Sequence, residues 1–314
     1  MGRLKVKPLY VSLKPFIDHR VLPIPVQWLS VFGNDNPLEV EIGIGNGEYL
    51  ARLAQENPHV NYVGFEEYGE RVSRSLRKLS RGSSDHVKVL RLDVRPAFHY
   101  YFNQRSIDFI HCLYPPPWPK KSDIKHRLLN TTFLRLCNSR LKDEKVMRIV
   151  TDFKPYARWI TEQAQDCGFD ITENAIGATF GTEFERKWQD EGKKEFHEIL
   201  LKKDKHWDIS VKGAADVRHY VFSDFNPDVF SMPDYTDGQC AVILKGFLYD
   251  PKRLMAQAHV LVHDEQLLQH TRVTIVKTDK GWHVGLAQGS MQMPTPGVAK
   301  AIECVYQAAL KSGK

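Results

Sequence analysis

The sequence lacks long apolar runs, paired cysteines and low-complexity segments. No stretch approaches the roughly 18 consecutive apolar residues of a membrane-spanning helix, so we expect no membrane segment. The N-terminal residues have no uninterrupted apolar core of the kind found in secretory signals, which favours a cytoplasmic protein. The five cysteines are scattered without a CxxC pair, so we expect reduced thiols and no structural metal site.

The sequence also lacks a large excess of positive or negative charge. It has 44 Lys and Arg residues and 38 Asp and Glu residues, for a net charge of +6. This total favours a nucleic-acid partner only weakly. The distribution is more informative, since the segment ERVSRSLRKLSR puts Arg71, Arg74, Arg77 or Lys78, and Arg81 on roughly one face of a helix. Such a stripe fits an RNA backbone and a solvated outer surface equally well.

The pattern of apolar and polar residues changes near Asp204. Before it, short apolar runs alternate with helical patterns, which predicts βαβ units and a mostly parallel, Rossmann-like α/β sheet. After it, runs such as QCAVILKGFLYD and TRVTIVKTDKG predict strands joined by turns, and the last twenty residues predict a closing helix. We expect an N-terminal extension (1–36), an α/β domain (37–203) and a small α+β domain (204–314).

A glycine-rich turn follows the first predicted strand. The segment EIGIGNGEYL places Gly43, Gly45 and Gly47 between that strand and its helix, where glycine lets the backbone turn tightly and approach a ligand. The dinucleotide fingerprint GxGxxG would need glycine where Glu48 stands. The pattern GxGxG is instead common in enzymes that bind S-adenosylmethionine.

Three carboxylates are expected around this turn, each at the end of a predicted strand. Glu41 precedes the glycines, Glu66 ends the second strand and Asp93 lies near the end of the third. Ligands of parallel sheets bind at the carboxyl ends of the strands. We therefore expect Glu41 to face a methionine ammonium, Glu66 to accept the ribose hydroxyls and Asp93 to meet the adenine amino group, although Glu66 or Asp93 alone fits an ordinary surface position.

The segment YPPPWPKK follows the fourth predicted strand and excludes regular structure, because proline lacks an N–H and fixes φ. A stiff loop at this strand end fits a methyl acceptor, since in-line displacement needs the nucleophile held close to the methyl group. Trp118 is expected to stack on a base, and Lys120 and Lys121 to meet phosphates. The alternative is that Trp118 only packs within the loop and that the two lysines are solvated.

Residues 37 to 203 resemble the bacterial tRNA (guanine-N7-)-methyltransferase family. The resemblance rests on the motifs EVEIGIGNG, NYVGFEE, RLDV, PWPKKSDIKHRL, VTDFKPYA and TEFERKWQDEG, in this order. It implies an RNA-binding enzyme that uses S-adenosylmethionine, held by the three acids, to methylate tRNA. It further implies that the tRNA guanine is bound by Lys120, Asp152 and the segment formed by Thr182, Glu183, Phe184 and Glu185.

The sequence departs from this family at one position, where Pro116 replaces the acidic residue of the usual DPWPKK motif. Guanine N7 carries an in-plane lone pair and needs no deprotonation, so a carboxylate there would mainly hold the base. Glu185 and Asp152 remain for that task. We assign no catalytic residue and expect weakened or altered activity. The alternative is a relative that has changed substrate, or that has lost catalysis and kept RNA binding.

Other chemistries fit the sequence less well. The segment PPPW is similar to the N/D-P-P-Y/F/W motif of amino methyltransferases that act on adenine or cytosine, but Pro115 cannot make the hydrogen bond they need. Carbon-5 methylation of pyrimidines needs a cysteine nucleophile, and Cys112 lies in an apolar strand that predicts a core position. His259 and His263 share a strand face without a third ligand, which favours a partly exposed strand over a metal site. The sequence leaves open the role of residues 204–314 and the oligomeric state.

Overall fold

The computed structural model describes residues 11–80, 82, 85–192, 195–238, 240–264, 267–290 and 292–313. The chain divides into two compact units, residues 1–212 and 213–314. Residues that follow Asp204 still bind to the first unit: the Asn138 amide donates to the Lys205 carbonyl at 2.9 Å, and the Arg140 guanidinium donates to the Ile209 carbonyl at 2.7 Å.

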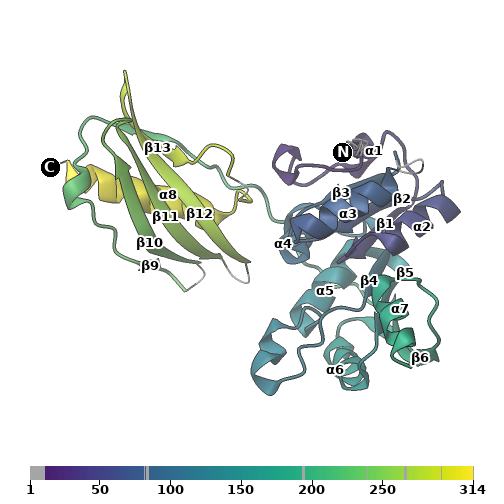
Figure 1. The fold of residues 1–314 in the computed structure, drawn as a ribbon. Coiled ribbons are helices and arrows are strands. Elements are labelled where there is room, and N and C mark those ends of the chain that lie inside the picture. Colours follow the sequence, from purple (N-terminus) through teal and green to yellow (C-terminus); the bar gives the residue numbers. More distant parts are fainter. Residues whose placement is uncertain are drawn as a thin grey trace, which may run out of the picture. The chain divides into compact units, whose positions relative to one another are not determined.

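The first unit is built on a seven-stranded sheet with the order β3-β2-β1-β4-β5-β7-β6 (Figure 1). The strands are β1 Leu38–Ile42, β2 Asn61–Phe65, β3 Val87–Leu90, β4 Ile107–Leu113, β5 Leu141–Thr151, β6 Phe169–Ile176 and β7 Phe196–Lys203. Strands β1 to β5 pair in parallel, and β7 runs antiparallel between β5 and β6. The Rossmann-like sheet expected from the sequence is confirmed.

Helices cover both faces of this sheet. They are α1 Trp28–Phe32, α2 Glu48–Glu56, α3 Gly69–Leu79, α4 Val94–Tyr100, α5 Thr131–Arg140, α6 Lys154–Ala164 and α7 Glu183–Asp190, with 3₁₀ turns η1 His19–Val21 and η2 Lys121–His126. Helices α2 and α3 pack with Tyr62 of β2, whereas Phe65 of β2 meets Phe102 on the other face. All five residues of β2 are buried, as expected for a strand covered on both sides.

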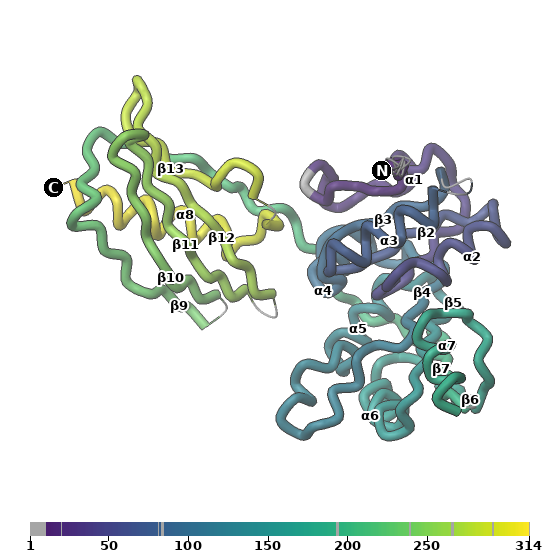
Figure 2. Tube along the Cα trace, viewed as in Figure 1, coloured from purple at the N-terminus to yellow at the C-terminus, as the bar shows by residue number. Residues whose placement is uncertain are grey.

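The second unit is a six-stranded antiparallel sheet with the order β8-β13-β12-β11-β10-β9 and one long helix, which Figure 2 traces along the chain. Its elements are β8 Tyr220–Phe222, η3 Pro227–Val229, β9 Tyr235–Thr236, β10 Cys240–Asp250, β11 Met255–Asp264, β12 Leu267–Thr278, β13 Gly281–Leu286 and α8 Pro296–Ser312. Buried positions alternate along β11, and its side chains Ala256, Ala258 and Val260 belong to the core that α8 shares. This arrangement is the small α+β domain expected from the sequence.

The described residues also show the state of the cysteines, the character of the helices and the grouping of possible metal ligands. All five cysteines are free thiols, and Cys112 is buried in the core of the first unit. Within the described ranges, no helix has both the length and the apolar character needed to cross a membrane. The same ranges contain no group of three or more His, Cys, Asp or Glu side chains arranged to hold a metal ion.

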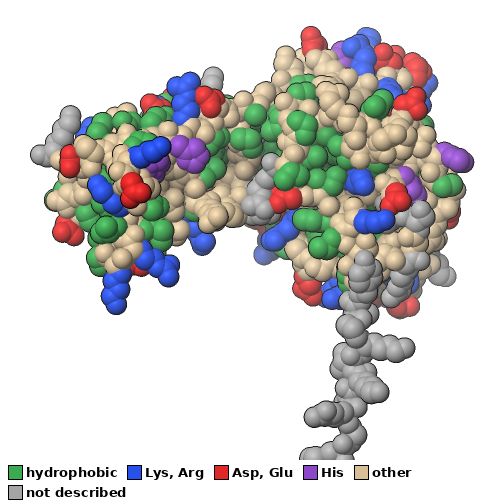
Figure 3. All heavy atoms as spheres, turned by 90° about the horizontal axis from the view of Figure 1, so that it is seen from above, with side chains coloured by type: hydrophobic (Ala, Val, Ile, Leu, Met, Phe, Trp, Pro, Cys, Tyr) green, Lys and Arg blue, Asp and Glu red, His purple; other side chains and the backbone are tan. Residues whose placement is uncertain are grey.

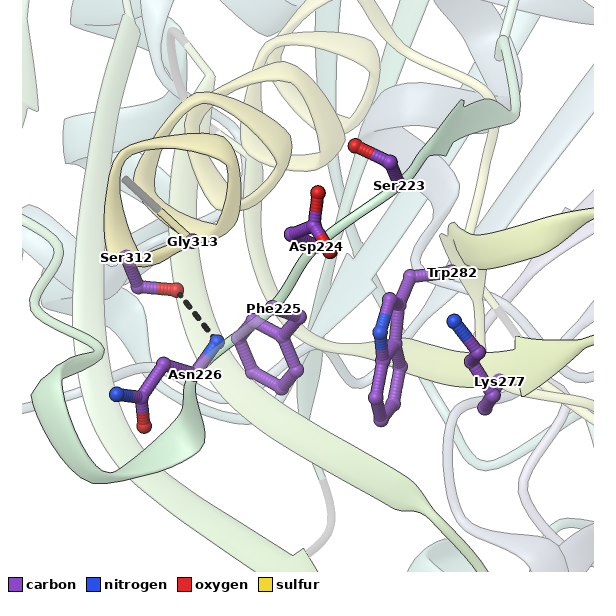
Figure 4. Close-up of a pocket in the computed structure, with 8 residues that line it drawn as sticks. All are labelled: Ser223, Asp224, Phe225, Asn226, Lys277, Trp282, Ser312 and Gly313. Carbon is purple, nitrogen blue, oxygen red and sulfur yellow. Dashed lines mark hydrogen bonds between the residues drawn. The ribbon is translucent and has the colours of Figure 1, made fainter.

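A shallow pocket of about 320 Å³ lies in the second unit (Figure 4). It lies where the end of α8 meets the loop after β8, and the Asn226 N–H donates to the Ser312 hydroxyl there at 3.3 Å. The Phe225 and Trp282 rings pack edge to face at 5.1 Å. None of the residues that line this pocket is among those expected at the site from the sequence.

Candidate active site

The glycine turn after β1 needs glycine for two physical reasons. Gly43, Gly45 and Gly47 all have left-handed backbones, with φ of 74°, 54° and 75°. A Cβ on Gly47 would lie 2.6 Å from the Cβ of Ser75 on α3, so a side chain would collide with that helix. The N–H groups of Gly43 and Ile44 both donate to the Phe65 carbonyl at 2.9 and 3.0 Å, which holds the turn against the end of β2.

Glu66 connects the end of β2 to the glycine turn. One carboxylate oxygen accepts the Gly45 N–H at 3.0 Å, and the other accepts the Tyr68 N–H at 3.0 Å. The side chain is buried, and the Arg71 guanidinium lies 4.0 Å from it. Each oxygen of a carboxylate has two lone pairs, so Glu66 retains acceptor capacity for a ligand hydroxyl.

Glu41 is a buried carboxyl group beside the same turn. It is 3% exposed, and its Oε2 atom has no hydrogen-bond partner among the residues that the structure describes. Burial, with a smaller contribution from the nearby charge of Glu48, raises the pKa of Glu41 to about 8. A buried polar atom without a partner is rare in native proteins, and a bound cation would satisfy this one.

Asp93 lies between β3 and α4 and begins that helix. Its carboxylate accepts the Arg95 N–H at 2.9 Å and is paired with the Arg95 guanidinium at 3.0 Å. Helix α4 has no signal in the sequence, because its seven residues are too few to show a helical period. Glu41, Glu66 and Asp93 thus lie at the ends of β1, β2 and β3, which are neighbours in the sheet.

The proline loop after β4 is held by a buried arginine. The Arg127 Nε–H donates to the Pro117 carbonyl at 2.8 Å, and Nη2 donates to the Trp118 carbonyl at 3.3 Å. The same guanidinium lies over the rings of Tyr156 and Trp159 on α6, at 5.1 and 4.9 Å. Trp118 itself has φ of 42°, an uncommon backbone for a bulky residue, so surrounding contacts must maintain it.

The outer surface of this loop carries the side chains expected to meet RNA. Trp118 is 41% exposed, and its ring lies 5.5 Å from that of His126. Lys120 and Pro116 are exposed, and Asp152, directly after the neighbouring strand β5, is half-buried.

Glu185 on α7 points into the protein. It is 1% exposed and accepts the Tyr114 hydroxyl at 2.6 Å, the N–H groups of Thr179 and Phe180 at 3.0 Å each, and the Gly181 N–H. These contacts fold the segment before α7 and connect it to the end of β4. The sequence contains a signal for this role, because Thr182 and Glu185 have the spacing of a capping box, and Thr182 does cap α7.

The start of α7 also meets the glycine turn. The Asn46 amide donates to the Glu183 carboxylate, and Arg186 lies 3.7 Å from Glu48. Phe184 is 41% exposed and stacks on Trp188 at 5.6 Å. The segment expected to bind the guanine therefore contacts the turn expected to bind the methyl donor.

The arginine stripe expected on α3 is mostly engaged with nearby side chains. Arg74 pairs with Glu70, and the Lys78 ammonium lies 2.5 Å from Glu48. Arg71 lies over the Tyr68 ring at 5.3 Å. Arg81 lies outside the described residues. Helix α3 therefore contacts the glycine turn and also contributes to the outer surface of the protein.

A buried polar chain beside Glu41, on its strand partner His111, has no signal in the sequence. His111 on β4 lies 2.8 Å from Glu39 and 3.2 Å from the Tyr49 hydroxyl. Burial lowers the pKa of His111, against the opposing effect of Glu39. A single histidine in an apolar strand gives no indication of its partners, because they come from β1 and α2.

The chain is similar to a known protein family and to several known proteins. Residues 35–198 match the protein family described as "Putative methyltransferase". A tRNA (guanine-N(7)-)-methyltransferase of Chlorobium phaeobacteroides is 36% identical over 169 residues, which are 54% of this chain and 83% of that protein. One from Thermotoga maritima is 30% identical over 203 residues, 63% of this chain and 64% of that protein. Among solved structures, the 16S rRNA methyltransferase KamB is 12% identical, with a TM-score of 0.46 over 57% of this chain and 93% of that one.

The matched residues include the glycine turn, the proline loop and the segment around α7. The family resemblance predicted from the sequence motifs is thereby confirmed. The chain belongs to the tRNA (guanine-N(7)-)-methyltransferase family.

Proposed function

We propose that this protein transfers a methyl group from S-adenosylmethionine to N7 of a guanine in tRNA. The observation that carries the proposal is Glu41, a buried carboxyl group with an unpartnered oxygen beside a left-handed glycine turn. A methyl donor that carries an ammonium group fits this position. The relatives named as tRNA (guanine-N(7)-)-methyltransferases support the choice of acceptor.

Each residue of the cofactor site has a separate task. The Gly43–Gly47 turn brings the backbone close to the donor, Glu41 pairs with its ammonium, Glu66 accepts its ribose hydroxyls and Asp93 accepts its adenine amino group. S-adenosylmethionine supplies an electrophilic methyl group on a positively charged sulfur. The protein then needs only to hold the acceptor in line with that methyl group.

The acceptor site is formed by the proline loop, the end of β5 and the start of α7. Trp118 offers an exposed ring for the guanine base, and Lys120 offers a charge for phosphate. Asp152 and the residues Thr182, Glu183 and Phe184 complete the site around the base. Glu185 acts on them indirectly, since its carboxylate holds the segment before α7.

No general base is required, so Pro116 is compatible with activity. The N7 lone pair lies in the plane of the base and attacks without prior loss of a proton. Catalysis then comes from proximity and orientation, which depend on the rigidity of the proline loop. The free thiols also support a reducing, cytoplasmic location.

The test is methyl transfer to bulk tRNA with labelled S-adenosylmethionine, followed by mass spectrometry of the released nucleosides. The expected product is 7-methylguanosine, made by the wild type and greatly reduced in Glu41→Gln. Another methylated nucleoside would contradict the assigned acceptor atom. Salt-sensitive tRNA binding without cofactor binding or methyl incorporation would show an RNA-binding relative that has lost catalysis.

A further inference from the structure

The C-terminal sheet has one face packed on α8 and one face that no described helix of this unit covers (Figure 1). We call the second side the open face. It is formed by the alternate strand positions that point away from α8, among them His259 and Leu261 of β11, His270 and Arg272 of β12, and His283 of β13. Their neighbours along each strand, such as Val260 and Val273, are fully buried on the α8 side, which fixes the direction of both sets.

All five histidines of residues 213–314 lie on this side. His259 and His270 are in contact, with Nε2 and Nδ1 3.1 Å apart and ring centroids 5.3 Å apart. The His219 ring packs against Gly285 of β13. A Cβ on Gly285 would be 2.1 Å from the His219 Nδ1, so the absence of a side chain at Gly285 leaves room for the ring. In Figure 3, histidine side chains of the C-terminal unit lie next to one another.

The centre of the open face carries positive and neutral groups. Arg272 is exposed and lies directly opposite His259 in the strand register. Among the described strand residues that point to this side, the one carboxylate is Asp250 at the end of β10, where Arg253 lies 3.7 Å from it. Asp264 points the other way and accepts the Gly297 N–H of α8 at 3.0 Å. An approaching phosphate therefore meets no negative charge at the middle of the sheet.

Planar side chains on an exposed sheet suit unpaired nucleotides. Imidazole rings and guanidinium planes stack on bases that are not engaged in a duplex, and arginine also meets phosphate. The same histidines do not form a metal site, since the described residues provide no group of three suitable ligands. Exposed aliphatic side chains, Leu268 at 54% and Val221 at 48%, add apolar area at the margins of the face.

We propose that the open face is a second RNA-contact surface, which binds an unpaired or loop segment with bases on His259 and His270 and a phosphate at Arg272. The identity of the RNA as tRNA rests on the function proposed above. The contact itself is independent of methyl transfer, so the two proposals can fail separately.

The test compares Arg272→Ala combined with His270→Ala against the wild type, with Lys311→Ala on α8 as a control that removes one charge elsewhere. Binding of fluorescent tRNA, and of a short unstructured oligoribonucleotide, is measured by anisotropy over a range of salt concentrations. The double variant should bind about tenfold more weakly with a salt slope reduced by about one, while the control stays within twofold. Arg272→Lys should recover the salt slope and only part of the affinity.

Turnover separates this role from a defect in the active site. In the double variant the KM for tRNA should rise while kcat at saturating tRNA and the melting temperature stay unchanged. Equal affinity and salt slope in wild type and variant would overturn the proposal. The proposal would also be overturned if the variant kept RNA binding but was a monomer in light scattering where the wild type is a dimer, since the open face would then bind a second copy of this chain. A wild type that binds RNA through this face and methylates nothing would refute only the proposed function.

Discussion

The buried guanidinium of Arg127 donates a hydrogen bond of 2.8 Å to the backbone carbonyl of Pro117. It donates a second bond to the next carbonyl in the loop and is itself packed on two aromatic rings of α6. Prolines alone restrict φ within the loop, but they do not fix where the loop lies. Arg127 supplies that second constraint, because it links the loop to a helix that follows β5.

We therefore expect Arg127→Ala to lower kcat about 10- to 100-fold, since a small displacement of the acceptor away from the line of attack has an effect of this size. The affinity for S-adenosylhomocysteine, measured by calorimetry, should stay unchanged because the cofactor residues come from β1 to β3. Arg127→Lys should restore only part of the rate, since an ammonium cannot make both hydrogen bonds and stack on both rings. A parallel loss of kcat and cofactor affinity would instead indicate general unfolding.

Glu185 should matter for stability as well as activity. Glu185→Gln places an amide NH₂ against backbone N–H groups that now donate to the carboxylate, so at least one buried donor loses its acceptor. We expect the free energy of unfolding in urea to fall by about 1–3 kcal/mol. Tyr114→Phe is the matched control, because it removes one hydrogen bond to the same carboxylate and should have a smaller effect. An unchanged midpoint in Glu185→Gln would refute the inward role of this residue.

Glu41 should make cofactor binding depend on pH. With a pKa near 8, its carboxyl group is mostly protonated and neutral at pH 7 in the free protein. An ammonium prefers the ionised form, so the protein must release a proton on binding. Affinity for S-adenosylhomocysteine should rise by up to about tenfold per pH unit between pH 6 and 8 and level off above.

Calorimetry in buffers of different ionisation enthalpy checks this directly, because released protons change the observed heat. Glu41→Gln should bind more weakly and lose the dependence below pH 8. If the wild type and Glu41→Gln had the same slope, the titrating group would lie elsewhere.

The sequence was most informative where one local pattern determined the structure. Apolar runs separated by helical periods predicted the parallel sheet, and the positions of the glycines and acids at strand ends followed from it. Helix α4 is not predicted by the sequence, because its seven residues are too few to show a helical period. Glu185 points inward, and Arg127 hydrogen-bonds the proline loop, because of partners that are distant in sequence. The periodicity of the sequence does not reveal such partners. The sequence predicts that His259 and His263 share a strand face, but not the contact of His259 with His270, which requires the register of two strands.

Pro116 provides the last prediction, since it stands where the family has an acidic residue. Pro116→Asp would add a carboxylate beside the base, able to accept the N1–H and N2–H edge of guanine and hold it in place. The backbone of the loop should tolerate the change, because Pro116 is exposed and Arg127 binds the two following carbonyls. We expect a several-fold lower KM for tRNA with a similar or higher kcat, measured by methyl incorporation. Pro116→Ala controls for the loss of proline, and identical kinetics in all three proteins would mean that this position no longer faces the bound guanine.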